Sequence, residues 1–457
     1  MTKPTASAHE LKKDALYFWE VLAQSIANIA PAASPALIIP MVFASSGNGT
    51  WIAYAIATLA MVFMATQINT FASRSASPGA LYTFTTQGLG PHWGSISGFA
   101  LFLAYAFTAA ATMAGFTNYA GVLLETLFQV KAGLALSAAI MLANIGALWW
   151  IARRDVQLST RAMLLLEFAS AGLILALTAA FFFRSGQLAD PVQFAAEGMT
   201  PRGLRMALVL ALFSFVGFES ATALGNEAKK PLQAIPKSVL YSVVAVGVFF
   251  TLMAYTLVLA FRGGAVALDK SPSPLADLAR FAGLPGLGLP LVVGALVGQF
   301  ACALASVTAA ARVMYSMARH GFFHPSAGRV HETHATPHVA VTGSILFAGA
   351  APLALLVRGL APMDVFGYLG SIATYGFLFS YMLVAVAAPV FLKARGELRS
   401  RNVLTAAITL LLLAIPIVGS VYPVPEAPYN YLPYIFLALM AAGTARVVLL
   451  AGRRSAR

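Results

Sequence analysis

The chain has 457 residues, of which 59% are hydrophobic and only 10% are charged, and its formal net charge is +13. Because soluble globular proteins carry roughly 25% charged residues, this composition excludes a soluble enzyme, a disordered chain and a fibrous protein. Long unbroken apolar runs are typical of membrane helices rather than of alternating barrel strands. We therefore expect an all-α polytopic membrane protein.

Apolar runs, taken in chain order, predict twelve transmembrane helices of about 20 residues or more. They cover residues 16–44, 51–72, 93–127, 132–151, 159–183, 204–226, 238–262, 286–318, 338–357, 363–391, 402–421 and 429–451. Residues 1–15 form a polar N-terminal segment, and residues 452–457 form a short tail.

The distribution of basic residues predicts the orientation. With both termini placed in the cytoplasm, 21 of the 29 lysine and arginine residues fall on the cytoplasmic side, as the positive-inside rule requires. We expect a multi-pass protein of the cytoplasmic (inner) membrane whose basic residues face anionic lipid and do not bind nucleic acid. Arg312, near the cytoplasmic end of its helix, is expected to extend its guanidinium to the membrane surface.

Neither a metal nor an organic cofactor is expected. The single cysteine, Cys302, excludes an internal disulfide and a cysteine metal cluster. Five of the seven histidines lie between residues 320 and 338, which we interpret as a solvated loop because no carboxylate cluster completes a ligand set.

The first predicted helix is interrupted near its middle by Pro31 and Pro35, which are surrounded by small residues. Each proline removes a backbone donor and frees a carbonyl about one turn upstream. Irregular backbone at membrane depth is tolerated only where it faces protein or a water-filled cavity. The amides of Ala32, Ala33 and Ser34, at the positive end of the second half-helix, are expected to bind a carboxylate.

The sixth predicted helix has a second interruption, where Gly217 and the ionisable Glu219 lie near mid-span. It follows the first by about 185 residues and five crossings. Interrupted helices at matching positions predict an inverted-repeat secondary transporter. The expected core consists of five helices in 16–183 and five in 204–391, with two further helices in 402–451 outside it.

Carbonyls freed at the ends of the two first half-helices, at Ile29, Phe213 and Val216, are expected to accept hydrogen bonds from an ammonium group. An anion site beside a cation site describes an α-amino acid. Gly217 lies at the second break, and Phe213, Phe215 and Phe218 are expected to wall or gate the side-chain pocket.

Charged groups within the membrane are costly and are often functional. We expect Glu219 and Glu167 to act in gating or proton coupling. Ser306 and Thr308, in the eighth predicted helix, are candidates for a sodium site. The choice between proton, sodium and exchange stays open.

Four features resemble the bacterial amino-acid permeases of the amino acid–polyamine–organocation (APC) superfamily. They are the segment 214–220 with its exit at 226–231 and 235–237, the segment 77–82 before the third helix, the segment 312–321 with 336–337 beyond it, and the twelve-helix layout. The resemblance implies a five-plus-five inverted-repeat core that transports its substrate by alternating access.

The resemblance also leaves alternatives. Pro31, Ala32 and Ala33 stand where the family usually has a glycine-rich turn, which leaves room for a polyamine, ethanolamine or another organic cation as substrate. The fifth helix carries Glu167 and lacks the lysine that some proton-coupled members have. A membrane enzyme or a sensor is the remote alternative. The oligomeric state and the particular substrate are not predicted.

Overall fold

The computed structural model describes residues 16–76, 79–154, 156–225, 227–331 and 336–455. The described residues form helices and one isolated parallel bridge between Leu16 and Ala228. The predicted N-terminal segment 1–15, the motif residues 77–78 and 226, residues 332–335 of the predicted histidine-rich loop and the end of the tail, 456–457, lie outside the described residues.

The longer helices, most of which have membrane-spanning length, are α1 (Phe18–Ile29), α3 (Thr50–Ala72), α5 (Pro91–Phe128), α6 (Leu134–Ala152), α7 (Val156–Ser185), α9 (Pro201–Phe213), α10 (Pro231–Ala260), α12 (Gly288–Arg319), α13 (His338–Val357), α14 (Pro362–Ala394), α15 (Ser400–Val421) and α16 (Leu432–Ser455). The shorter elements are η1 (Ser34–Ile38), α2 (Ile39–Ser46), η2 (Gly47–Gly49), α4 (Ala80–Leu89), α8 (Pro191–Phe194), η3 (Phe218–Leu224), η4 (Leu268–Lys270), α11 (Pro274–Phe281), η5 (Pro285–Leu287) and η6 (Pro325–Gly328).

Ten helical stretches within the described residues are long and apolar enough to cross a membrane. The first, Phe18–Ala72, contains both the first and the second predicted helix, and the last predicted helix is represented by a shorter apolar stretch, Leu432–Ala445. The fold class of a polytopic helical membrane protein is confirmed. The count of twelve crossings stays a prediction.

Several short helices were not predicted, and α4 and α11 are the longest of them. α4 occupies ten residues before α5, and Gly90, with φ of 89°, separates the two helices. α11 occupies eight residues between α10 and α12. Both are too short to give a membrane-length apolar run, so hydropathy alone does not detect them.

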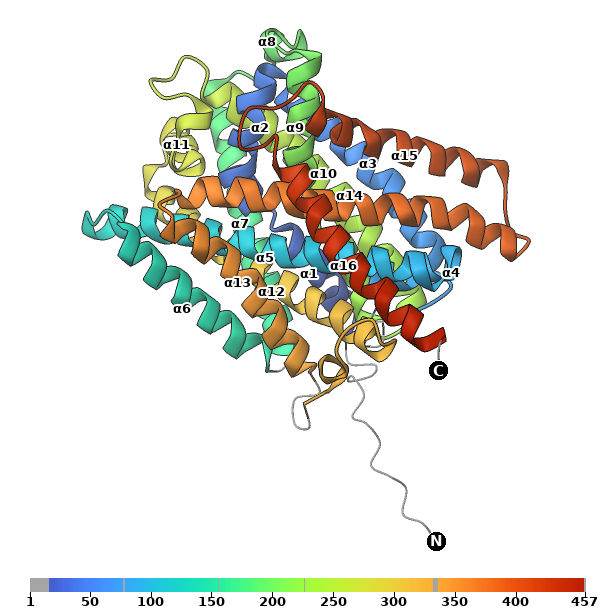
Figure 1. Cartoon of the computed structure of the whole chain (residues 1–457). Coiled ribbons are helices and arrows are strands. Elements are labelled where there is room, and N and C mark those ends of the chain that lie inside the picture. Colours follow the sequence, from blue (N-terminus) through green and yellow to red (C-terminus); the bar gives the residue numbers. More distant parts are fainter. Residues whose placement is uncertain (1–15, 77–78, 155, 226, 332–335, 456–457) are drawn as a thin grey trace.

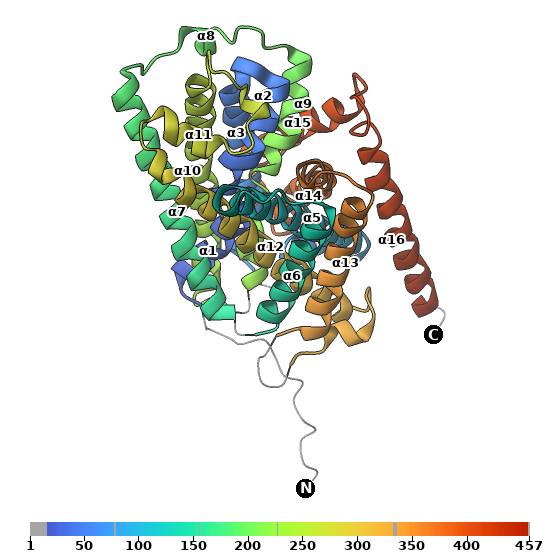
Figure 2. The same cartoon turned by 90° about the vertical axis from the view of Figure 1, so that its left-hand side faces the viewer.

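The long helix α5 lies at the centre of the molecule and packs against α12 and α14 (Figure 1). α16 runs along the outside of the bundle (Figure 2). Close packing at the centre depends on small residues, because most alanines and glycines of α5 and α12 are buried.

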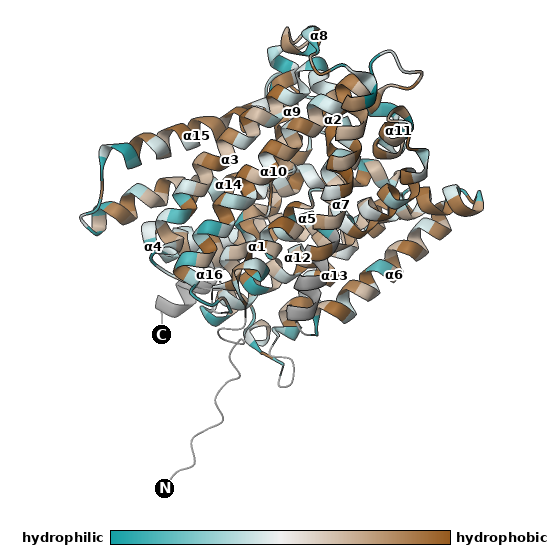
Figure 3. Ribbon diagram, turned by 180° about the vertical axis from the view of Figure 1, so that it is seen from behind, coloured by the Kyte–Doolittle hydropathy of each residue, from teal (hydrophilic) through white to brown (hydrophobic). Residues whose placement is uncertain are grey.

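Apolar residues also cover the outside of the bundle, as the brown outer ribbons of α6 and α15 in Figure 3 show. Leu142 and Trp150 on α6, and Leu404 and Leu411 on α15, are each more than half exposed. Exposed apolar surface of this extent is expected where lipid replaces water.

Candidate functional site

The two interrupted helices meet at their breaks. α1 ends at Ile29, and Ala30 adopts a left-handed conformation with φ of 50° before the π-helical turn η1 begins at Ser34. α9 ends at Phe213, and the chain turns at residues 214–217 before the 3-10 helix η3. Both segments are buried.

Reciprocal hydrogen bonds join the two breaks. The hydroxyl of Ser25 donates to the carbonyl of Phe218 at 2.6 Å, and the hydroxyl of Ser220 donates to the carbonyl of Gln24 at 3.1 Å. Both bonds run between α1 and η3, the segments on either side of the two breaks. The breaks therefore form one structural unit.

Asn28, one residue before the end of α1, connects this unit to α12. Ser306 donates to Asn28 Oδ1 at 2.6 Å, and the Cys302 thiol donates to the Asn28 carbonyl at 3.0 Å. The side chain of Asn28 also packs against Gly217, which has φ of 93°. A Cβ at position 217 would lie 2.2 Å from Asn28 Nδ2, so this contact requires glycine.

The predicted anion site is partly occupied by the backbone itself. The amides of Ala33 and Ser34 both donate to the carbonyl of Ala30, at 2.9 and 3.3 Å. Of the three predicted donors, Ala32 is left, and its amide faces the carboxylate of Glu167.

Glu167 lies on α7 and is only 2% exposed. Neither of its carboxylate oxygens has a hydrogen-bond partner among the described residues. Gly298 of α12 lies directly against it, since a Cβ at that position would be 3.0 Å from Glu167 Oε1 and 3.8 Å from the Cβ atoms of Ala32 and Ala33. The structure thus places this carboxylate at the break in the first helix.

Glu219 has a different environment from Glu167. It is fully buried at the start of η3, and it accepts hydrogen bonds from Tyr105 of α5 at 2.6 Å and from Tyr381 of α14 at 2.5 Å. Hydrogen bonds to an ionised acceptor are short and strong. Glu219 thereby connects three separate elements through its two oxygens.

The three predicted wall residues point to different places, and the ring of Phe218 packs against Tyr381 of α14 with ring centroids 5.7 Å apart. The ring of Phe213 packs against Phe366 of α14, with ring centroids 5.8 Å apart. Phe215 packs into the core against Tyr54 and Phe250, on α3 and α10. Val216, between them, is buried in the turn.

The structure does not place the two hydroxyls of the candidate sodium site together. Ser306 is buried against α1, as described above, whereas Thr308 is half-buried and its carbonyl accepts a hydrogen bond from Arg312 at 3.3 Å. Residues two apart on a helix point about 200° from each other.

Several buried polar atoms around the break lack a partner among the described residues. They are Asn28 Nδ2, Ser34 Oγ, both oxygens of Glu167, Thr222 Oγ1 and Gln299 Oε1. Buried polar groups are normally hydrogen-bonded, so the unpartnered atoms of Asn28, Ser34 and Glu167, which lie at or beside the first break, favour this place for a polar ligand. Sequence patterns did not identify Asn28 or Gln299, because a single amide within an apolar run has no distinctive spacing.

A buried ion pair lies beyond the breaks, toward the predicted cytoplasmic side. Arg312 donates to both carboxylate oxygens of Glu227, at 2.9 and 2.8 Å, and the two side chains are 3% and 7% exposed. The expectation that Arg312 extends to the membrane surface is therefore wrong, because Glu227 supplies a bidentate partner inside the protein. Leu16 bonds through its backbone to Glu227 and Lys229, which ties the start of α1 to the same loop.

The fold and the paired breaks define the class: an integral multi-pass membrane protein with two interrupted helices that meet at their breaks. The family model described as amino acid permease matches residues 20–424, and the chain belongs to this family. The predicted resemblance is confirmed, and the family consists of transporters rather than enzymes.

Curated relatives agree with this assignment. The branched-chain amino acid permease BcaP of Bacillus subtilis is 26% identical over 373 residues, which cover 78% of this chain and 76% of the relative. The cationic amino acid transporter 4 of mouse is 23% identical, covering 74% of this chain and 54% of the relative. The low-affinity putrescine importer PlaP of Escherichia coli is 25% identical, covering 71% of each.

Proposed function

We propose that this protein is a secondary active transporter that carries amino acids across the cytoplasmic membrane by alternating access, coupled to protons. The observation that carries the proposal is the unpaired carboxylate of Glu167 beside the Ala32 amide at the break in the first helix. The family match and the named amino-acid permease among the relatives support the substrate class.

The proposed topology has twelve crossings with both termini in the cytoplasm. Residues 16–183 and 204–391 form two inverted five-helix repeats, and 402–451 add two outer helices. The π-helical break after α1 and the 3-10 break after α9 support this arrangement, because interrupted helices at matching positions are characteristic of inverted repeats.

Glu167 gives a physical reason for proton coupling. A substrate carboxylate that approaches the Ala32 amide must lie close to the carboxylate of Glu167. Two carboxylates that share one site cannot both be ionised without a large cost. We therefore propose that Glu167 takes up a proton when the amino acid binds, so that substrate and proton cross together.

Glu219 serves as a gate in this scheme. An ionised Glu219 accepts from both Tyr105 and Tyr381 and holds η3 against α5 and α14. Movement of η3, the segment after the second break, must break these two hydrogen bonds. Protonation would weaken them, because a neutral carboxyl group accepts more weakly.

A polyamine or another organic cation is the second candidate. The same unpaired Glu167 carboxylate would pair with an ammonium group that lacks a neighbouring carboxylate. The name of the putrescine importer among the relatives is consistent with this alternative.

A ligand panel separates the two candidates. The purified protein is heated in detergent with leucine, with isoamylamine, which lacks the carboxylate, or with 4-methylpentanoic acid, which lacks the amine. A bound ligand stabilises the protein by about 2.7 kcal/mol at 100 times its Kd. The other natural α-amino acids are tested in the same way as leucine. We expect leucine or another complete α-amino acid to stabilise the protein, and we expect no stabilisation by isoamylamine or 4-methylpentanoic acid. Stabilisation by amines alone would contradict the amino-acid assignment and favour the second candidate.

A further inference from the structure

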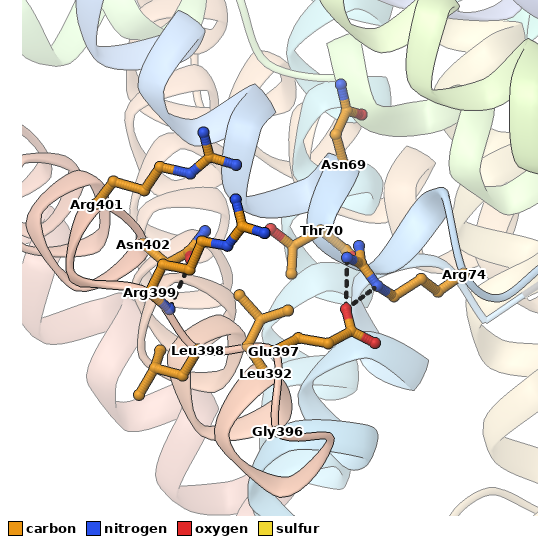
Figure 4. Close-up of a pocket in the computed structure, with 10 residues that line it drawn as sticks. All are labelled: Asn69, Thr70, Arg74, Leu392, Gly396, Glu397, Leu398, Arg399, Arg401 and Asn402. Carbon is orange, nitrogen blue, oxygen red and sulfur yellow. Dashed lines mark hydrogen bonds and ion pairs between the residues drawn. The ribbon is translucent and has the colours of Figure 1, made fainter.

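A cavity of about 570 Å³ lies away from the helix breaks, among the ends of α3 and α14 and the start of α15. Its lining residues are Asn69, Thr70, Arg74, Leu392, Gly396, Glu397, Leu398, Arg399, Arg401 and Asn402 (Figure 4). The loops on which it lies are predicted to be cytoplasmic, and they contribute no group to the site at the breaks.

Positive charge dominates the lining of this cavity, which has three arginines and one glutamate. Arg74 pairs with Glu397 at 2.7 Å, and its hydrogen bonds hold the pKa of Glu397 below its usual range. Arg399 and Arg401 form no ion pair with a described residue. Figure 4 shows that both extend from the start of α15 toward α3. Two guanidinium groups are therefore available to an anion.

The backbone adds to this positive character. α15 begins at Ser400, so its first free amides and the positive end of its dipole lie at the same cavity. The amide of Arg399 donates to Asn402 Oδ1 at 3.0 Å, which fixes the first turn of the helix.

Apolar surface adjoins the charged groups. Leu392 and Leu398 line the cavity, and Val403 and Leu404, on the following turn of α15, are 49% and 61% exposed. A ligand that fits both parts has an anionic head and an apolar chain.

We propose that this cavity binds the phosphate headgroup of an anionic membrane lipid, with Arg399 and Arg401 as its main contacts. Arginine pairs with phosphate through two parallel hydrogen bonds. Basic pockets between helices at the cytoplasmic side of a membrane are suited to anionic headgroups. The lipid chain lies along the apolar side of α15.

The test measures lipid binding to the full-length protein by native mass spectrometry, with dioleoyl-phosphatidylglycerol and dioleoyl-phosphatidylcholine as probes. The pocket variant combines Arg399→Gln with Arg401→Gln. The control combines Arg153→Gln with Arg154→Gln, which removes the same charge from another pair on the predicted cytoplasmic side, stacked on Trp149 and Trp150.

We expect the wild type and the control to prefer phosphatidylglycerol, and the pocket variant to bind it at least about tenfold more weakly, because each basic residue beside anionic lipid contributes several-fold in affinity. Equal losses of phosphatidylglycerol affinity in the two double variants would overturn the proposed site, because they would show only a general attraction of the lipid to basic residues. Displacement of the lipid by millimolar inorganic phosphate would overturn the lipid assignment and indicate free phosphate as the ligand.

Discussion

Two buried carboxylates differ in the partners that surround them. Glu219 is fully hydrogen-bonded by tyrosines, whereas Glu167 has no hydrogen-bond partner among the described residues. A buried polar group without a partner destabilises the protein. A group that persists under this cost is expected to serve a function, and for Glu167 we propose proton uptake.

Glu167→Gln should separate stability from coupling. The amide of glutamine keeps the side-chain volume and cannot ionise, so the apparent Tm should stay the same or rise. Exchange of labelled substrate across proteoliposomes should continue, whereas accumulation driven by a pH gradient should be lost. Accumulation at the wild-type level would contradict the role of Glu167.

Glu219→Gln should weaken the connection between η3, α5 and α14. Loss of hydrogen bonds to a charged acceptor costs about 1.5–3 kcal/mol each, so thermal stability should fall and the pH dependence of uptake should flatten. Tyr105→Phe is the matched variant: it removes one donor and keeps the carboxylate. It should retain the pH dependence and lose only part of the stability. Identical pH profiles for Glu219→Gln and the wild type would argue against a gating role.

The break in the second interrupted helix depends on a backbone conformation. Gly217→Ala should lower the free energy of unfolding in two ways. A left-handed backbone conformation costs a residue with a Cβ roughly 1–2 kcal/mol, and overpacking against Asn28 costs about 1–3 kcal/mol. Gly186→Ala is a control, because Gly186 also has positive φ and its Cβ would meet open space. Thermal unfolding should show a clearly larger loss for Gly217→Ala. Equal losses would show that the contact with Asn28 is unimportant.

The loop after η3 is held to α12 by the pair Glu227–Arg312. Removing one partner leaves a buried charge unpaired and typically costs 3–5 kcal/mol, whereas replacing both by apolar residues costs much less. We expect Arg312→Met and Glu227→Met each to lower the apparent Tm strongly, and the double variant to recover most of the loss. A double variant no more stable than either single one would exclude a direct coupling between the two residues.

At the scale of the whole molecule, hydropathy predicted the fold class well, because long apolar runs and paired prolines or glycines are visible in sequence. The same reasoning did not predict α4 and α11, whose lengths are below one membrane span. It also placed Arg312 at the surface, because its partner Glu227 is 85 residues away and only the packing of α12 against that loop unites them.

The candidate site was predictable only in part. The breaks and both acids were identified from residue type and position. The roles of Tyr105, Tyr381 and Asn28 were not, because they depend on which faces of separate helices meet. Phe213 and Phe215 are two residues apart, and the turn at 214–217 sends their rings to different neighbours.

The central claim is that an amino acid and a proton cross together. The most direct measurement is uptake of labelled amino acids by proteoliposomes of the purified protein, under a pH gradient or a sodium gradient imposed separately. We predict concentrative uptake of at least one α-amino acid with the pH gradient, none with the sodium gradient, and no competition by amines that lack a carboxylate. Uptake of putrescine or another amine without uptake of any amino acid would contradict the claim.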